Sequence, residues 1–288
     1  MSPNTPFGLE APGITRPHYV LDKSYLDGAS FARIQYLAQN GVNLLLPDAL
    51  IHELVRKRDR QRTHDFFKLA KFDGNLFVLP GIGEMFRAEQ EFNAPAPSIL
   101  RAPRVGLHPR LLPSGELGLD IEALQSAFQH TDELNAGLPP IVEIWREFGS
   151  IPKLKDAAPT DRPRVIEELC AEIRDDRESM RRFYSNHRPA TFPSADLLDE
   201  RWALFRWQQV YLLAGLDFYA RYGLEAEPDE ETLLHERIDL DYTITALLAG
   251  GLASDDSDMR ERFRFLRPDG LLMPLRRAST TSSSRGEP

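Results

Sequence analysis

Four acidic residues stand at the ends of apolar segments that are spread over nearly the whole chain. Asp22 follows the apolar run 18–21, and Glu53 comes soon after the run 42–46. Asp241 opens the segment 241–248, and Asp256 lies in the acidic stretch 254–259. A parallel α/β sheet collects residues from the carboxyl ends of its strands in one crevice. Carboxylates that meet there without Lys or Arg partners repel one another, so the pattern predicts a divalent cation between them.

Each of these residues also has an ordinary structural interpretation. Asp22 could cap the element after the first strand, and Glu53 could lie on the surface of a helix. Asp241 could stabilise a helix N-terminus through the helix dipole, and residues 255–258 could be a polar turn. The prediction of a shared site therefore depends on the order and spacing of the acidic residues.

The elements that would position these residues are strands and helices in alternation. Strands are predicted at residues 19–21, 42–46 and 76–79. Residues 30–40 are typical of a helix that ends at Gly41. Pro47 suits the first turn of a second helix, with Glu53 at the flank of its apolar stripe. This alternation predicts βαβ units and a mostly parallel sheet.

A long helical segment separates this first α/β part from a second one. Residues 93–118 are rich in Pro and Arg, and helical patterns follow at 120–148, 162–185 and 195–222, with one or two more at 230–248. Gly250 and Gly251 then precede a short strand at 252–253. We expect a flexible arm at 1–17, an α/β part at 18–92, an irregular connection and helical insertion at 93–229, a second α/β part at 230–275 and a disordered tail at 276–288.

The order of these motifs resembles the PIN-like nuclease family. The resembling segments are Val20-Leu21-Asp22-Lys23-Ser24, Leu46-Pro47-Asp48-Ala49-Leu50-Ile51-His52-Glu53-Leu54, the helix start Asp241 with Ile244 and Ala246, and Ser254-Asp255-Asp256-Ser257-Asp258-Met259. Together they cover residues 18–92 and 230–273 of the chain.

The resemblance implies a three-layer α/β/α domain with a small, mostly parallel sheet, here carrying a large helical insertion. It implies that acidic residues bind Mg²⁺ or Mn²⁺ and that the protein hydrolyses phosphodiester bonds. The corresponding acids are Asp22, Glu53, Asp241 and Asp256, with Asp258 as a fifth metal ligand. Ser24 and Ser254 match the small hydroxyl residues of the family's motifs.

The chain departs from the family pattern in three places. The helical stretch at 93–225 is longer than the pattern has there, and Met259 stands where the family has an aromatic residue. Asp239 competes with Asp241 for the position of the third acid. The two differ by about 200° around a helix, so only one of them can face the site.

The expected function is that of a nuclease that cuts RNA more readily than DNA, with Arg clusters near Glu53 and Asp256 holding phosphates. Two alternatives remain open: an inactive PIN-like module that binds protein or RNA, and a metal-dependent phosphatase for smaller esters. By family analogy the chain could also be a toxin with a protein inhibitor, or a homo-oligomer.

The bulk properties exclude several other classes of protein. The formal charge of −9 argues against wholesale coating of a polyanion. A single cysteine, Cys170, excludes an internal disulfide framework, and the apolar runs are too short to span a bilayer, so a cytoplasmic location is expected. His52-Glu53 begins like the zinc-protease motif, but Arg56 occupies the place of its second His.

Overall fold

The computed structural model describes residue 7 and residues 16–57, 59–72, 75–102, 104, 143, 146–147, 151–187, 192–223 and 229–274. Most of the expected arm at 1–17, the expected tail at 276–288 and most of the helix expected at 120–148 lie outside the described residues. Phe7, which belongs to the expected arm, is fully buried, and its carbonyl accepts a hydrogen bond of 3.0 Å from the Ala102 amide.

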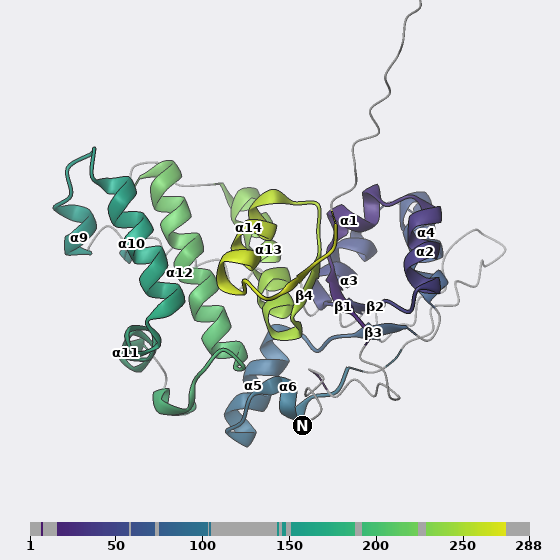
Figure 1. Ribbon diagram of the computed structural model, residues 1–288, viewed down its shortest axis with the longest axis horizontal. Helices are drawn as coiled ribbons and strands as arrows, with labels where there is room; N and C mark the ends of the chain where they lie inside the picture. Colours follow the sequence, from purple (N-terminus) through teal and green to yellow (C-terminus); the bar gives the residue numbers. More distant parts are fainter. Residues whose placement is uncertain are drawn as a thin grey trace, which may run out of the picture.

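Five parallel strands form a sheet in the order β3-β2-β1-β4-β5 (Figure 1). The strands are β1 (His18–Leu21), β2 (Asn43–Leu46), β3 (Leu76–Val78), β4 (Gly251–Ala253) and β5 (Leu271–Leu272). In the middle of the sheet β1 pairs with β2 and with β4, so that Leu21 lies opposite Ala253. All residues of β2 and β4 are buried, which explains why both strands are almost continuously apolar.

The helices near the strands are α1 (Lys23–Gly28), α2 (Phe31–Gln39), α3 (Asp48–Arg56), α4 (Asp59–Leu69), α5 (Ile82–Phe92), α13 (Glu230–Ala249) and α14 (Ser257–Leu266), with the 3₁₀ turn η2 (Ala70–Phe72). α13 packs against β1 and β4. In Figure 1 the strands lie between α13 and the pair formed by α2 and α4. The expected α/β class with a parallel sheet is confirmed, and this arrangement is compatible with three layers.

The helical segment adds further layers on the far side of α13. Its described elements are α6 (Ala96–Ile99), α9 (Pro152–Lys155), α10 (Arg162–Asp175), α11 (Arg177–His187), η3 (Ala195–Leu197) and α12 (Ala203–Tyr222). α12 packs against α13, and α10 packs against α12 (Figure 1). The insertion therefore packs against α13, which also packs against strands of the sheet.

Two expectations about helix boundaries are corrected. The continuous helix expected at 162–185 is two helices, because the Asp176 carboxylate accepts hydrogen bonds from the amide and the hydroxyl of Ser179 and caps the start of α11. The pattern at 195–222 contains η3 and a long α12 that begins only at Ala203. The one or two helices expected at 230–248 are the single helix α13, whose first turn is capped by the Asp229 side chain.

Glu89 on α5 connects the α/β part to the helical segment. Its Oε1 accepts hydrogen bonds from the amides of Ala96 (3.0 Å) and Ala203 (2.6 Å), and its Oε2 accepts one from Leu204 (3.0 Å). These amides begin α6 and α12, where backbone N–H groups have no partner within the helix. The side chain is fully buried, and burial raises the pKa of Glu89 to about 7 although the three amide donors lower it.

We expect Glu89→Gln to destabilise the fold. A glutamine keeps one oxygen and turns an NH₂ group toward a buried amide, so the free energy of unfolding should fall by about 1–3 kcal/mol. Urea denaturation measures the change. Glu91→Gln, on an exposed position of the same helix, is the control and should stay within about 0.5 kcal/mol of the wild type. Equal unfolding midpoints for the two variants would contradict the anchoring role.

Candidate active site

Asp22 lies at the carboxyl end of β1 and is held by hydroxyl groups. Its Oδ2 accepts hydrogen bonds from the Ser24 hydroxyl and, at 2.7 Å, from the buried Ser254 hydroxyl. The Ser24 hydroxyl oxygen accepts a hydrogen bond from the Asp255 amide, and the Ser254 hydroxyl oxygen accepts one from the Asp256 amide, both at 3.0 Å. These contacts join the ends of β1 and β4. Burial raises the pKa of Asp22, and the hydrogen bonds from the two serines lower it.

Glu53 reaches the same region from α3. Its Oε2 accepts a hydrogen bond of 2.7 Å from the Tyr242 hydroxyl on α13, and its Oε1 lies 3.8 Å from the Lys23 amine. Burial raises the pKa of Glu53, Tyr242 and Lys23 lower it, and the charge of Asp22 raises it further. The two carboxylates are therefore close enough to repel each other.

Asp239 on α13 is a carboxylate whose pKa is raised strongly by burial and by neighbouring acids. Burial raises its pKa to about 8, and the charges of Glu236, Asp256, Asp22 and Glu53 add to the rise. Three of these neighbours are residues that the sequence assigned to the site. Asp239 therefore belongs to the group that we call the acidic cluster, which consists of Asp22, Glu53, Asp239 and Asp256.

Asp241 faces a different part of the protein, which corrects the expectation that it is the third acid. Its carboxylate is 2% exposed and forms an ion pair with Arg237, one helical turn earlier, with 3.3 Å between Nε and Oδ1. Burial raises the pKa of Asp241, and the charge of Arg237 lowers it. The angular difference of about 200° between Asp239 and Asp241 accounts for the two environments.

Asp256 and Asp258 also differ in their surroundings. Asp256 caps α14, because its Oδ1 accepts the Met259 amide at 2.7 Å, and its charge acts on both Asp22 and Asp239. Asp258 is exposed and pairs with Arg221 of α12 at 2.8 Å. The structure therefore brings Asp256 to the acidic cluster and leaves the expected fifth ligand, Asp258, in a surface ion pair.

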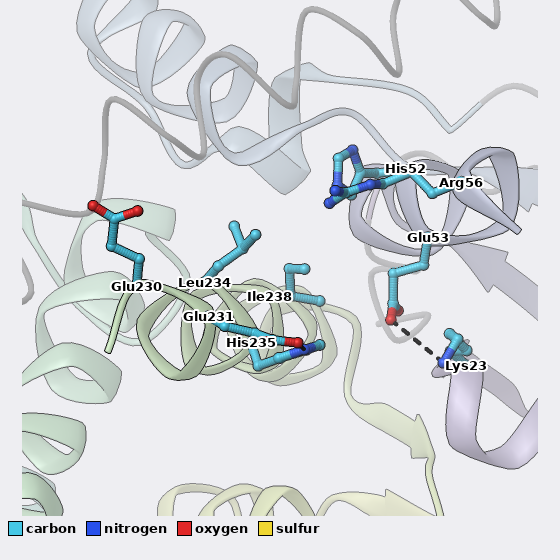
Figure 2. Close-up of a pocket in the computed structure, with 9 residues that line it drawn as sticks. All are labelled: Lys23, His52, Glu53, Arg56, Glu230, Glu231, Leu234, His235 and Ile238. Carbon is cyan, nitrogen blue, oxygen red and sulfur yellow. Dashed lines mark hydrogen bonds and ion pairs between the residues drawn. The ribbon is translucent and has the colours of Figure 1, made fainter. Parts of the chain in front are cut away.

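A pocket of about 500 Å³ opens beside the acidic cluster, between α3 and the first turns of α13 (Figure 2). Lys23, His52 and Arg56 line one side of it together with Glu53. The Arg56 guanidinium lies 3.4 Å from the His52 ring nitrogen. The pocket therefore combines basic groups with one carboxylate of the acidic cluster.

The acidic cluster fits a hard cation in its chemistry. Within the described ranges, no three His, Cys, Asp or Glu side chains lie close enough together to hold a metal ion as they stand. Burial is the main reason why the pKa values of Asp22, Glu53 and Asp239 are raised, and neighbouring carboxylates add a smaller repulsion that a cation would relieve. Mg²⁺ keeps several waters and is often held by only one or two carboxylates, so convergence of three ligands is not required.

Two contacts of the site could have been inferred from residue spacing. Asp239 and Tyr242 are three residues apart and so lie on one face of α13, where Tyr242 meets Glu53. Arg237 and Asp241 are four residues apart, the spacing of an intrahelical ion pair. Both spacings favour Asp239 over Asp241 as the residue that faces the site.

Comparisons with protein-family models, with curated proteins and with solved structures gave no match. Among the described helices, none is both long enough and apolar enough to cross a bilayer. A functional assignment therefore has to come from the chemistry of the site.

We expect Asp239→Asn to raise the melting temperature at pH 8 in the presence of a chelator. An acid with a higher pKa in the folded than in the unfolded protein binds its proton more tightly when folded. Its contribution to stability is therefore present at low pH and is lost as the pH rises from its unfolded value of 3.8 through about 8. Asparagine removes the repelled charge, and each kcal/mol relieved should raise the melting temperature by about 2–4 °C.

Thermal melts of wild type and variant at pH 5 and pH 8 measure this effect, which should be larger at pH 8. Asp258→Asn, which removes an exposed and paired carboxylate, is the matched control and should change little. A variant that is less stable than the wild type at pH 8 would contradict the repulsion within the acidic cluster.

Proposed function

We propose that this protein is a metal-dependent phosphodiester hydrolase, a nuclease whose substrate is RNA rather than DNA. The observation that supports the proposal is the acidic cluster, in which Asp22, at the carboxyl end of β1, interacts electrostatically with Glu53, Asp239 and Asp256. In parallel α/β folds this edge of the sheet is where ligands bind. The preference for RNA and for a PIN-like mode of action comes from the resemblance in the sequence.

Asp22 and Glu53 are the residues that would hold Mg²⁺ or Mn²⁺. Both hydroxyl donors, those of Ser24 and Ser254, lie on Oδ2 of Asp22. A bound divalent ion would supply an acidified water and would stabilise negative charge on the phosphodiester. Tyr242 fixes the Glu53 carboxylate through its hydroxyl hydrogen bond.

Asp239 is suited to handle the proton of the attacking water. Its pKa of about 8 lies near physiological pH, where a group can both accept and release a proton. Asp256 holds the start of α14 with one oxygen and adds its charge to the cluster. In this proposal Asp239, and not the Asp241 expected from the sequence, is the third acid of the site.

The pocket beside the acidic cluster is suited to hold substrate phosphates. Lys23 and Arg56 bring positive charge to its rim, next to Glu53 (Figure 2). Basic groups that contact phosphates position a nucleic acid without reading its sequence. Glu230 and Glu231 also line this pocket, so Lys23 and Arg56 are individual points of contact for phosphates within a lining of mixed charge.

The first test is cleavage of single-stranded RNA with added Mn²⁺. The wild type should cleave, and Asp22→Asn should abolish cleavage while keeping the circular dichroism spectrum of the wild type. Mn²⁺ at 100 times its Kd should also stabilise the wild type by about 2.7 kcal/mol and leave the variant unchanged. Asp258→Asn is the control and should keep both properties. Stabilisation without cleavage of any polynucleotide would indicate a binding module, and equal cleavage by Asp22→Asn would refute the proposal.

The second test compares Asp239→Asn with Asp241→Asn. Loss of Asp239 should reduce kcat by about 10²–10⁴-fold, because a group that transfers a proton is removed. Asp241→Asn breaks a buried ion pair and should lower stability, with kcat per folded molecule kept within a few-fold. Activities are measured well below both melting temperatures. If Asp241→Asn lowered kcat more than Asp239→Asn did, Asp241 and not Asp239 would be the third acid.

A further inference from the structure

A second pocket lies at the opposite edge of the sheet from the acidic cluster. Its volume is about 820 Å³, and its lining includes His18 at the start of β1, Gly250 just before β4 and Leu271 at the start of β5. Because the strands are parallel, their amino ends share this edge. β1 spans about 13 Å at 3.3 Å per residue, so the pocket is separate from the site at Asp22.

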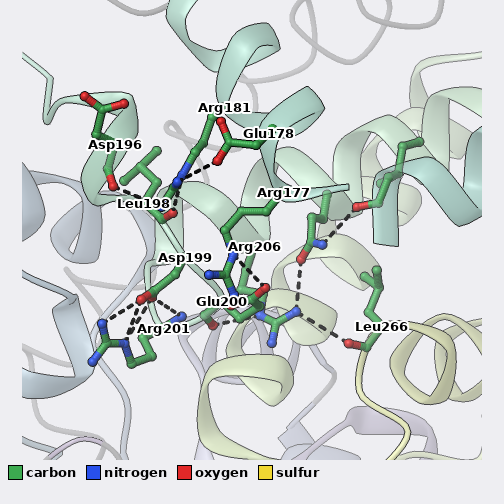
Figure 3. A network of polar contacts seen from close by, with 12 residues as sticks. Arg177, Glu178, Arg181, Asp196, Leu198, Asp199, Glu200, Arg201, Arg206 and Leu266 are labelled. Atoms are coloured by element: carbon green, nitrogen blue, oxygen red, sulfur yellow. Dashed lines mark hydrogen bonds and ion pairs between the residues drawn. The ribbon is translucent and has the colours of Figure 1, made fainter. Parts of the chain in front are cut away.

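Arg206 of α12 brings a buried positive charge to this pocket (Figure 3). The residue is 5% exposed. Its Nε donates to the Glu200 carbonyl at 2.8 Å, and its Nη1 donates to Gln209 Oε1 at 2.9 Å and to the Leu266 carbonyl at 3.5 Å. Among the described residues, no carboxylate forms an ion pair with Arg206 and no acceptor meets its Nη2.

Arg267 adds a second positive charge to the same pocket. Its Nη1 donates to the Leu247 carbonyl near the end of α13, and no carboxylate within the described ranges pairs with it. Burial lowers the pKa of Arg206 to about 10, and the nearby charge of Arg267 lowers it as well. Two arginines that repel each other in a protected space create a positive potential that an anion would relieve.

The acids around this pocket offset part of that charge, because Glu200, Asp269 and Asp199 raise the pKa of Arg206. Glu200 is engaged by Arg177, with 2.6 Å between Nη2 and Oε2. Asp269 lines the pocket from an exposed position and forms no ion pair with a described residue. Arg201, also on the rim, is already paired with Asp199 at 2.6 Å. Arg206 and Arg267 are therefore the groups free to meet a ligand.

We propose that this pocket binds a small organic phosphate, whose phosphoryl group sits on Arg206 and Arg267. A guanidinium presents a planar fork of N–H donors that matches phosphate oxygens. The volume falls in the range of ordinary ligand pockets, and Leu248, Leu266 and Leu271 supply apolar walls for the organic part. A nucleoside monophosphate has both features, a phosphate and a flat, weakly polar base.

Isothermal titration calorimetry with the full chain tests this proposal. The probes are AMP, inorganic phosphate and adenosine, in a chelator so that the acidic cluster binds no metal. AMP should bind more tightly than phosphate, and adenosine should bind at least tenfold more weakly than AMP. Failure of both AMP and phosphate to bind at millimolar concentration, or equal binding of AMP and adenosine, would overturn the proposal.

Three variants locate the binding. Arg267→Gln and Arg206→Gln should each weaken AMP binding by about 10- to 100-fold, as expected when a charge-assisted hydrogen bond to phosphate is lost. Arg164→Gln, at an exposed arginine paired with Glu168, is the matched control and should bind AMP as the wild type does. Wild-type affinity in both pocket variants would overturn the proposal.

Both arginines also donate hydrogen bonds to backbone carbonyls, so replacing either one could disturb the fold. A variant that keeps both arginines is therefore needed as well. Ser98→Trp places a large side chain at an exposed position of the pocket lining. It should block AMP while leaving the melting temperature close to that of the wild type. Unchanged AMP affinity in a folded Ser98→Trp protein would also overturn the proposal.

Discussion

The candidate site depends on carboxylates that are held mainly by hydroxyl and amide donors, although the Lys23 amine also lies 3.8 Å from Glu53. Asp22 is held by the hydroxyls of Ser24 and Ser254, Glu53 by the hydroxyl of Tyr242, and Asp256 by the amide of Met259. Such donors orient an oxygen without cancelling its charge. Arginine partners in the same places would have given stable ion pairs and left nothing for a cation to do. The protein instead keeps a concentration of negative charge at the ends of β1 and β4, where the backbone is best ordered by the sheet.

Helix α13 separates two kinds of buried acid on its opposite sides. Toward the acidic cluster it presents Asp239 and Tyr242, and toward α12 it presents the ion pair of Arg237 with Asp241. The Arg237 guanidinium also lies over the Tyr211 ring of α12, 5.1 Å from its centroid. One side of the helix thus carries charge that is compensated, and the other carries charge that is not. The compensated side secures the helix in the core, so that the other side can tolerate repulsion.

Much of this arrangement was predictable from the sequence, and the exceptions have physical causes. The parallel sheet followed from apolar runs in alternation with helices, and Asp22 and Ser254 followed from their positions just beyond such runs. The third acid was predicted at Asp241 because it begins an apolar stretch, yet helical phase decides which residue faces the site. The break at Asp176 depends on a side-chain cap that competes with continued helix. Contacts such as that between Glu89 and Ala203 join distant segments and leave no local pattern in the sequence.

The contacts of Glu89 also bring the start of α6 close to the start of α12. The amides of Ala96 and Ala203 bond to the same oxygen atom, so the two points of the chain are no farther apart than two hydrogen-bond lengths. Glu89 therefore closes a loop of the chain, and the entropy of closing such a loop grows only slowly with its length. One buried carboxylate thus anchors the first turns of two helices that are far apart in the sequence and adjacent in space.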